Sequence, residues 1–429
     1  MILSKCQQAA ETAYYNFLTN DKQKEMVIAG FAGSGKSFLT KHLIDITDKY
    51  NAVQSAIIPG FRPVPISITA TTNKAANVAS WFSGKPACTI HSLLGLKVRD
   101  NYEKGITEIK ESDRTGQLYG IVFIDEASMI DFNLYQIIRK YTKKAKVVYI
   151  GDNYQLPPVF SNESVVFTNP NTVFLKEIQR QVANNPIIQL SQKFRAILDQ
   201  GLPFEWPDIV PDNKHIFCIT GSQFEHLVRT KFTQPHGLDD MRIIGWTNNK
   251  VISYNKFVRT LYTNSIGYDV NEQVIVNSPV MLDEYVAAPI DTVLTICSVQ
   301  DDISKHNIKG QYLKFVGIPG QYFQAYNHLD VDNLLKHYRK AKDWHNFFDV
   351  KNFYIDVRPP WALTCHKAQG STFEEVFIDL NDIDRNNKWY EIARLVYVAL
   401  TRASNKVYLY GSLKSAQRFT NNGKIPYKK

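Results

Sequence analysis

The sequence lacks several features that would assign it to common classes of protein. Its five cysteines are scattered, the nearest two being Cys297 and Cys365, so no pair has the spacing of a zinc site or a redox motif. No apolar run approaches the roughly 18 residues that a membrane-spanning helix needs. The first fifteen residues also lack the apolar core of a secretory signal. We therefore expect no membrane contact and a cytoplasmic protein of a reducing compartment.

Acidic residues are fewer than basic ones, 41 against 50, which gives a formal net charge of +9. A basic chain favours polyanionic partners such as nucleic acid, although charge alone identifies none. Glycine and proline are not enriched, at 21 and 18 residues, which excludes collagen-like and low-complexity chains. Apolar residues make up 44% of the chain, which is enough for sizeable cores. Aromatic residues make up 12%; they either fill these cores or provide rings on which nucleic-acid bases stack.

Short β-rich apolar runs alternate with helical stretches, which is the pattern of a parallel sheet with crossover helices. Helices are expected at 36–46 and 73–82. Residues 273–358 differ, since they combine short β-like runs with one polar helix over 331–348, and we expect an inserted β-rich domain there. The chain is long enough for about three domains. Strands are expected at 26–29, 66–70, 120–124, 146–150, 241–245, 375–378 and 406–410.

A phosphate-binding loop follows the first of these strands. Residues 30–37 spell GFAGSGKS, a complete G-x-x-x-x-G-K-[ST] motif between the strand MVIA and the helical stretch SFLTKHLIDI. Glycines let backbone N–H groups turn toward phosphates at a helix N-terminus. A chance glycine loop is the alternative, and both flanks argue against it. The pattern predicts an ATP site with Lys36 on the β- and γ-phosphates and the Ser37 hydroxyl on Mg²⁺; the residues expected to hold the nucleotide are Gly30, Ala32, Gly33, Ser34, Gly35, Lys36 and Ser37.

Two further strand ends carry polar residues suited to the same nucleotide. The strand GIVFIDE delivers Asp125, a candidate Mg²⁺ ligand, and Glu126, a candidate base that orients the attacking water. The alternative is a helix cap, because DEAS before an apolar run is good capping chemistry. The segment GDNYQLPPV at 151–159 follows another strand and is either a simple turn or the support of Gln155 at the γ-phosphate. Ligands of open α/β sheets lie at the carboxyl ends of the strands, so we expect these groups to converge.

Five motifs in order resemble the helicase motifs of superfamily 1, in its RecD-like branch (1B): GFAGSGKS, FIDEAS, GDNYQLPPV, ALTCHKAQGSTF and VYVALTRA. The resemblance covers most of 3–180 and 241–411. It implies an α/β fold of two RecA-like P-loop NTPase domains with a β-hairpin insertion and a small β-rich, SH3-like insertion. The implied division is 1–95 and 111–178 for the first motor domain, 96–110 for the hairpin, 179–274 and 359–429 for the second motor domain, and 275–358 for the inserted domain.

The same resemblance assigns roles at the nucleotide. Gln7 matches the adenine-reading glutamine, with Gln8 as an alternative. Arg180 matches an arginine that reaches the γ-phosphate from the second motor domain, and Arg402 matches the arginine finger of the last motif. In the ALTCHKAQGSTF segment, Gly370 with its neighbours Lys367, Gln369 and Ser371 is expected to link the DNA groove to the nucleotide.

For DNA, the resemblance points to three segments and a hairpin. Thr72 and Lys74 lie in TATTNKAA, which has Thr71 where a proline is common; Thr89 with His91, and Thr364 with His366, form two T-x-H segments. A lone histidine is more often a core or surface residue, but the repeated pattern favours DNA contact. Residues 96–119 predict a β-hairpin that is either a plain surface hairpin or the pin that splits the duplex, with Tyr102 as candidate wedge and Lys104 also near the tip.

The sequence therefore predicts an ATP-dependent DNA helicase, a DNA-stimulated ATP hydrolase with ATP and Mg²⁺ as cofactors. We expect it to move 5′-to-3′ on single-stranded DNA as a monomer and to unwind duplex at a single-strand/double-strand junction in phage replication or recombination, in the host cytoplasm if phage-encoded. A single-stranded-DNA-binding protein is an optional partner. The alternatives are a translocase that displaces bound proteins with little unwinding, a non-motor P-loop ATPase, and a nuclease-linked protein, against which no acidic metal cluster beyond Asp125 and Glu126 is found.

Overall fold

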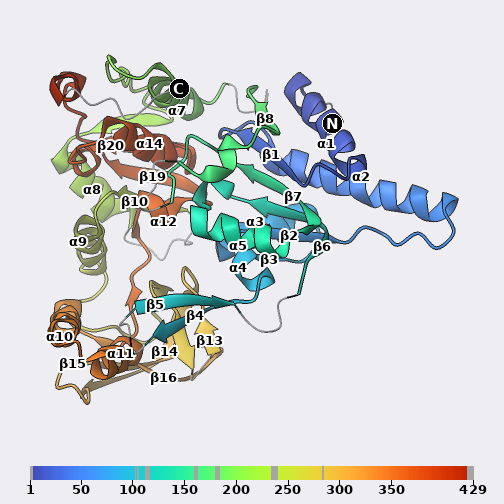
Figure 1. The fold of residues 1–429 in the computed structure, drawn as a ribbon. Helices are drawn as coiled ribbons and strands as arrows, with labels where there is room; N and C mark the ends of the chain where they lie inside the picture. The colour runs from blue at the N-terminus through green and yellow to red at the C-terminus, as the bar shows by residue number, and fades with distance from the viewer. Residues whose placement is uncertain are drawn as a thin grey trace.

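The computed structural model describes residues 3–101, 103, 106–111, 116–158, 163–178, 184–232, 240–282 and 285–422 of the 429-residue chain. In these residues two parallel sheets lie side by side, and a mainly antiparallel body lies next to the second (Figure 1). We call them the first domain, the second domain and the inserted domain. The predicted α/β class is confirmed.

The first domain is built on a six-stranded sheet whose paired strands are all parallel. Its central strands are apolar at nearly every position because helices cover both faces: Met26 and Ile28 pack in one core, and Val27 packs in the other. In spatial order the strands are β3 (Ala87–Thr89), β2 (Ile66–Ala70), β6 (Tyr119–Asp125), β7 (Lys144–Gly151), β1 (Glu25–Gly30) and β8 (Thr172–Leu175).

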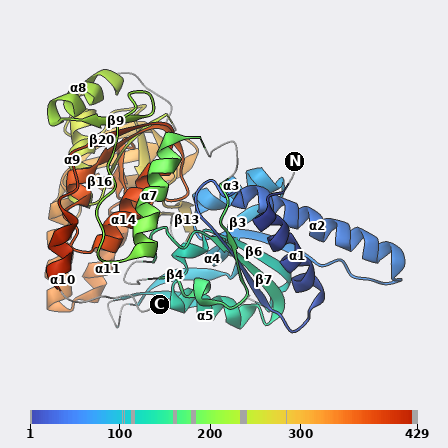
Figure 2. The ribbon, with the colours of Figure 1, turned by 90° about the horizontal axis from the view of Figure 1, so that it is seen from above.

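One helix of the first domain is longer than the sequence predicts. The helix after the phosphate loop was expected to end at residue 46, but it continues to Ile57. Its buried residues stop at Thr47, so the last ten residues lack the apolar periodicity from which an end is predicted, and this part of the helix projects beyond the sheet (Figures 1 and 2). The helices are α1 (Lys5–Thr19), α2 (Lys36–Ile57), α3 (Asn73–Ser83), α4 (Ile90–Leu93) and α5 (Phe132–Tyr141), with 3₁₀ turns η1 (Ala127–Met129) and η2 (Val165–Thr168).

The second domain is built on a five-stranded parallel sheet, and α14 (Trp389–Leu400) packs against two of its strands. Every residue of α14 except Glu391 is buried, and the helix packs against α7 (Pro186–Gln200). In spatial order the strands are β18 (Ala362–Thr364), β10 (Met241–Gly245), β19 (Phe373–Asp379), β20 (Ala403–Tyr410) and β9 (Ile216–Ile219); the other helices are α8 (Gly221–Lys231), α9 (Asn248–Arg259), α12 (Cys365–Ala368), α13 (Leu380–Ile383) and η3 (Ala416–Asn422).

The inserted domain is β-rich, but its helical part differs from the prediction. The single helix expected over 331–348 is wrong, because α10 (His328–Ala341) and α11 (Trp344–Phe353) are separate helices. Lys342 takes a left-handed conformation with φ 57°, which ends α10, and the Asp343 side chain accepts the Asn346 N–H to begin α11. The strands are β11 (Gln273–Val276), β12 (Val280–Leu282), β13 (Tyr285–Ala288), β14 (Val293–Ile303), β15 (Lys309–Phe315), β16 (Ile318–Ala325) and β17 (Val357–Arg358).

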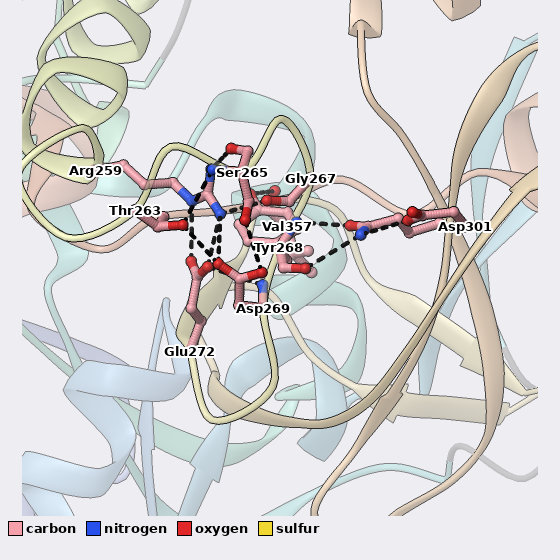
Figure 3. Close-up of polar contacts among 10 residues, drawn as sticks. Arg259, Thr263, Ser265, Gly267, Tyr268, Asp269, Glu272, Asp301 and Val357 are labelled. Carbon is pink, nitrogen blue, oxygen red and sulfur yellow. Dashed lines mark hydrogen bonds and ion pairs between the residues drawn. The ribbon is translucent and has the colours of Figure 1, made fainter.

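A polar cluster joins the inserted domain to the second domain (Figure 3). Arg259, the last residue of α9, donates to both carboxylate oxygens of Glu272, at 2.7 and 3.0 Å, and its guanidinium lies over the Tyr268 ring. The Tyr268 hydroxyl donates to the carbonyl of Val357, 2.9 Å away, on the strand that returns to the second domain. The outgoing and returning connections are therefore fastened to each other.

The hairpin predicted after α4 is present as β4 (Leu96–Asn101) and β5 (Ile106–Glu111), paired antiparallel from Leu96↔Glu111 to Asn101↔Ile106. The tip residues Tyr102 and Lys104 lie outside the described residues. Among the helices that the structure describes, none is both long enough and apolar enough to cross a bilayer.

Candidate nucleotide site and nucleic-acid groove

The phosphate loop connects β1 to α2 at the carboxyl edge of the first sheet. Gly33 and Gly35 both have φ 81°, a left-handed conformation that side chains disfavour, which is the physical reason for glycine here. Lys36 Nζ donates to the carbonyls of Gly30 and Phe31, at 2.7 and 3.3 Å, so the ammonium group lies across the loop. Ser37 follows in the first turn of α2.

Of the two candidate glutamines, only Gln7 contacts this loop. Its buried side chain donates to the carbonyl of Ser34, 3.3 Å away, and accepts the Ser4 N–H at 3.1 Å, as part of the cap of α1. Gln8 is exposed and donates to the carbonyl of Leu3. The geometry therefore favours Gln7 over Gln8 as a group near the nucleotide.

Asp125 and Glu126 lie at the carboxyl end of β6. Glu126 occupies the N-cap position of η1, but its side chain makes no cap bond there, and its φ is 54°. Glu126 Oε2 is buried and has no hydrogen-bond partner among the described residues. Thr71 donates its N–H to the Asp125 carbonyl and its hydroxyl to the Glu126 carbonyl, at 3.3 and 3.2 Å. A proline at 71 would lack that N–H, so the departure from the family pattern has a local use.

The charges at this edge depend on one another. Burial and the neighbouring Asp125 carboxylate raise the pKa of Glu126 to about 7, against the opposing effects of Lys36 and Arg402. Burial likewise raises the pKa of Asp125, although the Glu126 N–H, 2.8 Å from Asp125 Oδ1, and Lys36 act in the other direction. Two half-buried acids side by side are the arrangement in which an added cation is most stabilising.

The loop after β7 brings Gln155 to the same place. Its side chain is buried, and Gln155 Oε1 lies 3.5 Å from Gln369 Nε2 of the second domain. Gln369 also donates to the carbonyl of Leu156 at 3.2 Å. The loop after β7 is therefore held in place by Gln369 of the second domain.

The second domain contributes Gly370 and Arg402 to the interface. A Cβ added at Gly370 would lie 3.9 Å from Glu126 Oε1 and 3.8 Å from the Ala75 Cβ, so this backbone faces Glu126 directly. Arg402 is buried, donates to the carbonyls of Val398 and Ser371, at 3.2 and 3.0 Å, and acts electrostatically on Glu126. Arg180 lies outside the described residues.

Sequence reasoning missed two interface residues of α14. Arg394 donates to the carbonyls of Asn153 and Gln155, at 2.7 and 2.6 Å, and the Tyr397 hydroxyl contacts Asp152 and the N–H of Ala32. The available signal was their spacing of three within an otherwise apolar helix, which puts both polar groups on one face.

The threonines predicted to contact DNA share one local structure. Each of them lies at or just after the end of a strand: Thr72 follows β2, Thr89 ends β3 and Thr364 ends β18. Each is also the N-cap of the next helix (α3, α4 or α12), where its hydroxyl accepts the backbone N–H of the residue three positions later. His91 and His366 follow two residues after a cap, which is the structural content of the repeated T-x-H pattern. Burial lowers the pKa of His91, with Asp131 acting in the opposite direction.

A cleft of about 330 Å³ runs between the three domains. Lys74 of the first domain and Thr364 of the second line it, and Lys74 Nζ lies 5.3 Å from the centroid of the Phe373 ring across the interface. Thr72, Thr89, His91 and His366 are outside this lining. Its other charged residues are Arg242, Asp291, Arg358 and Lys367.

Comparison with known proteins identifies this arrangement. Residues 17–161 match the family model of an AAA domain, and residues 359–410 match that of the UvrD-like helicase C-terminal domain. The ATP-dependent DNA helicase dda of Enterobacteria phage T4 is 26% identical over 90% of this chain and 94% of its own length. The chain is therefore similar to the superfamily 1B helicases over most of its length. The ATP-dependent RecD2 DNA helicase of Deinococcus radiodurans is 24% identical over 91% of this chain and 47% of its own.

Solved structures of this helicase family agree in fold. Pif1 helicase from Bacteroides, in complex with ADP-AlF3 and single-stranded DNA, has a TM-score of 0.50 at 16% identity, covering 100% of this chain and 95% of that one. A second Pif1 structure, concerned with unwinding at forked duplex DNA, has a TM-score of 0.50 at 17% identity with the same coverage. The predicted resemblance to superfamily 1B helicases is confirmed.

Proposed function

We propose that this helicase hydrolyses ATP to move along single-stranded DNA and to unwind duplex DNA. The observation that carries the proposal is the interface itself. The phosphate loop and acidic pair of the first domain meet Gly370 and Arg402 of the second, and a cleft lined by cations of both domains lies beside them. A nucleotide bound in this interface would contact both domains and so control how they fit together.

Each group at the interface has a task that its chemistry suits. Lys36 neutralises the β- and γ-phosphates, Glu126 orients the attacking water through its unpartnered Oε2, Gln155 contacts the γ-phosphate, and Arg402 stabilises charge in the transition state. Arginine fingers of this kind typically contribute about 10³–10⁵ in rate. Gln7 would read the adenine, and Arg180 would add a second cation.

The residues present also fit Mg²⁺. Buried Glu126 Oε2 lacks a partner among the described residues, and the pKa of each acid is raised, so a cation is favoured beside them. Mg²⁺ in such sites takes a few protein oxygens and completes its shell with phosphate and water. Asp125 and Ser37 would hold the ion, which supplies charge neutralisation at the phosphates.

The DNA groove connects to the nucleotide through one short segment. Thr364 and Lys367 line the cleft, and Gly370 lies against Glu126 a few residues later, so a shift in one end of the segment moves the other. Hydroxyls, amides and lysines recognise phosphates without reading bases, which suits a protein that moves along any sequence. We extend the groove to Thr72, Lys74, Thr89, His91 and His366.

The finer parts of the function rest on the relatives. We propose 5′-to-3′ movement, a duplex-splitting pin at 96–110 with Tyr102 as wedge, and a role in phage replication or recombination in the host cytoplasm, with a single-stranded-DNA-binding protein as partner. We propose a monomer because both halves of the nucleotide site belong to one chain.

The test compares three activities. The ATPase rate should rise strongly when single-stranded DNA is added, and Lys36→Ala should abolish it while leaving nucleotide-free DNA binding intact. A duplex with only a 5′ single-stranded tail should be unwound, and one with only a 3′ tail should not. ATP turnover that ignores DNA would contradict the motor, and protein displacement without unwinding would favour the translocase alternative.

A further inference from the structure

One buried hydroxyl connects three elements that surround the nucleotide. The Tyr397 hydroxyl, on α14 of the second domain, donates to Asp152 Oδ2 at 2.6 Å and accepts the N–H of Ala32 in the phosphate loop at 2.9 Å. The residue is fully buried, so water does not replace either bond. Burial and the Asp152 carboxylate raise the pKa of Tyr397 well above its usual value, so the hydroxyl stays protonated as a donor.

The same Asp152 shapes the loop that carries Gln155. Its other oxygen, Oδ1, accepts the Tyr154 N–H at 3.0 Å, and its carbonyl accepts the Gln155 N–H at 3.2 Å. A tilt of the Asp152 side chain therefore moves the turn that places Gln155. Tyr397 acts on this turn through Asp152, while Arg394, one helical turn earlier, holds the carbonyls of Asn153 and Gln155.

The far end of α14 leads to the arginine finger. The helix ends at Leu400, and Arg402 follows it with its guanidinium bonded to the carbonyl of Val398 in the last turn of that helix. A rigid, buried helix thus has Tyr397 fixed to the first domain and Arg402 fixed to its own end. A change at the phosphate loop that displaces the Tyr397 hydroxyl is transmitted along the helix.

We propose that Tyr397 is a positioning residue that couples the phosphate loop and the Gln155 turn to the arginine finger. It touches neither the substrate nor the reacting atoms in this role. Its hydroxyl keeps α14 seated so that Gln155 and Arg402 reach their working positions together when DNA stimulates turnover. The inference rests on the proposed ATPase and goes beyond it by adding a residue that acts through Asp152 and Ala32.

Tyr397→Phe removes only the hydroxyl and keeps the buried ring. The DNA-stimulated kcat should fall about tenfold, because a buried acceptor and a buried N–H lose their partner. The KM for ATP should stay within about twofold, since Lys36 and the glycine amides are untouched, and the ratio of DNA-stimulated to DNA-free rate should shrink.

A matched control has the same chemistry elsewhere. The Tyr254 hydroxyl donates to Asp379 Oδ2 at 2.5 Å in the core of the second domain, away from the interface. Tyr254→Phe should lower the melting temperature to a similar extent as Tyr397→Phe but leave the DNA-stimulated kcat near wild type. Equal kcat losses in both variants, or an unchanged kcat in Tyr397→Phe, would overturn the proposal.

A double-mutant cycle covers the case in which Tyr397→Phe is poorly folded. Asp152→Asn removes the acceptor charge from the opposite side at constant volume, and its kcat loss should not add to that of Tyr397→Phe if the two act as a pair. Fully additive losses would contradict coupling through Asp152. If DNA does not stimulate the ATPase rate of the unmodified protein, the proposed function itself is refuted. That result is distinguishable from any outcome with the variants.

Discussion

The charge of a single residue at the domain interface depends on neighbours from both domains. Glu126 is the clearest case, because Asp125, Lys36, Arg402 and Asp152 all act on its charge. A carboxylate with one unpartnered buried oxygen is matched to a water that needs orientation, whereas a structural carboxylate would be fully bonded.

Glu126→Gln should keep ATP binding and lose turnover by about 10²–10⁴, because the amide retains the shape but accepts a proton poorly. Nucleotide binding and single-turnover hydrolysis measure the two separately. The control is Glu11→Gln, since the Glu11 carboxylate of α1 bonds to His42 of α2, at 2.8 Å. Wild-type turnover in Glu126→Gln would remove Glu126 from the reaction.

Arg402→Lys should retain the positive charge but lose the planar fork, and we expect the DNA-stimulated rate to fall by about 10³ with little change in nucleotide binding. Stopped-time ATPase assays with and without DNA measure this. Arg385→Lys, at a side chain that is 69% exposed, is the control. If both variants behave as wild type, Arg402 serves only its own domain through Val398 and Ser371.

His91 provides a test of pH dependence. Because burial lowers its folded pKa below the unfolded value of 6.5, the unfolded chain binds the extra proton first as pH falls. Its contribution to stability is therefore fully present above pH 6.5 and is lost as pH drops toward the lower folded pKa. Melting temperatures of wild type and His91→Gln should converge as pH falls from 7.5 to 5; a constant difference would contradict the direction of the shift.

At the scale of secondary-structure elements, the hairpin β4–β5 is the candidate for separating DNA strands. The hairpin β4–β5 is antiparallel along its whole described length, so it is a paired two-stranded arm. Such an arm separates strands only if translocation pulls one strand past it, so its contribution is separable from ATP hydrolysis.

Deleting residues 100–105 should therefore leave DNA-stimulated ATPase within about twofold of wild type and abolish strand separation, because the deletion shortens the hairpin at the end of β4 and leaves the six-stranded sheet of the first domain untouched. Fork unwinding and single-strand translocation assays measure the two activities. Tyr102→Ala is the milder companion variant, expected to slow unwinding alone. Full unwinding after the deletion would make the hairpin a plain surface feature.

At the scale of the whole molecule, the net charge of +9 raises the question of which basic residues bind DNA. Lys74, Arg242 and Lys367 line the cleft between the domains, whereas Lys143 lies exposed just before β7, at the opposite edge of the first sheet. The same residue type is thus placed where phosphates are expected and where they are not.

Binding of single-stranded DNA should weaken with salt, with a log–log slope of about −0.7 for each phosphate neutralised. Lys74→Ala should reduce the magnitude of that slope by about 0.7, and Lys143→Ala should leave it unchanged. Fluorescence anisotropy over a salt series measures both. Equal effects from the two lysines would argue that DNA binds by overall charge and not in the cleft.

The sequence by itself determined the local chemistry of this protein. The phosphate loop, the acidic strand end and the T-x-H segments are short, and their structures depend on neighbouring residues, so pattern and spacing suffice to predict them. The central strands of both parallel sheets were also predicted, because burial on both faces leaves continuous apolar runs, whereas the edge strands β3, β8, β9 and β18 were missed. The split of 331–348 at Lys342 was missed, since a left-handed lysine has no sequence signature.

Only the tertiary structure decided how these parts meet. Gly370 facing Glu126, Gln369 beside Gln155, and Tyr397 between Ala32 and Asp152 join residues that are more than 200 positions apart. Such contacts depend on how two sheets pack, and packing is set by the summed fit of many side chains, which no local pattern encodes. Sequence supplied the reacting groups of each domain, and the packing of the domains placed them on one nucleotide site.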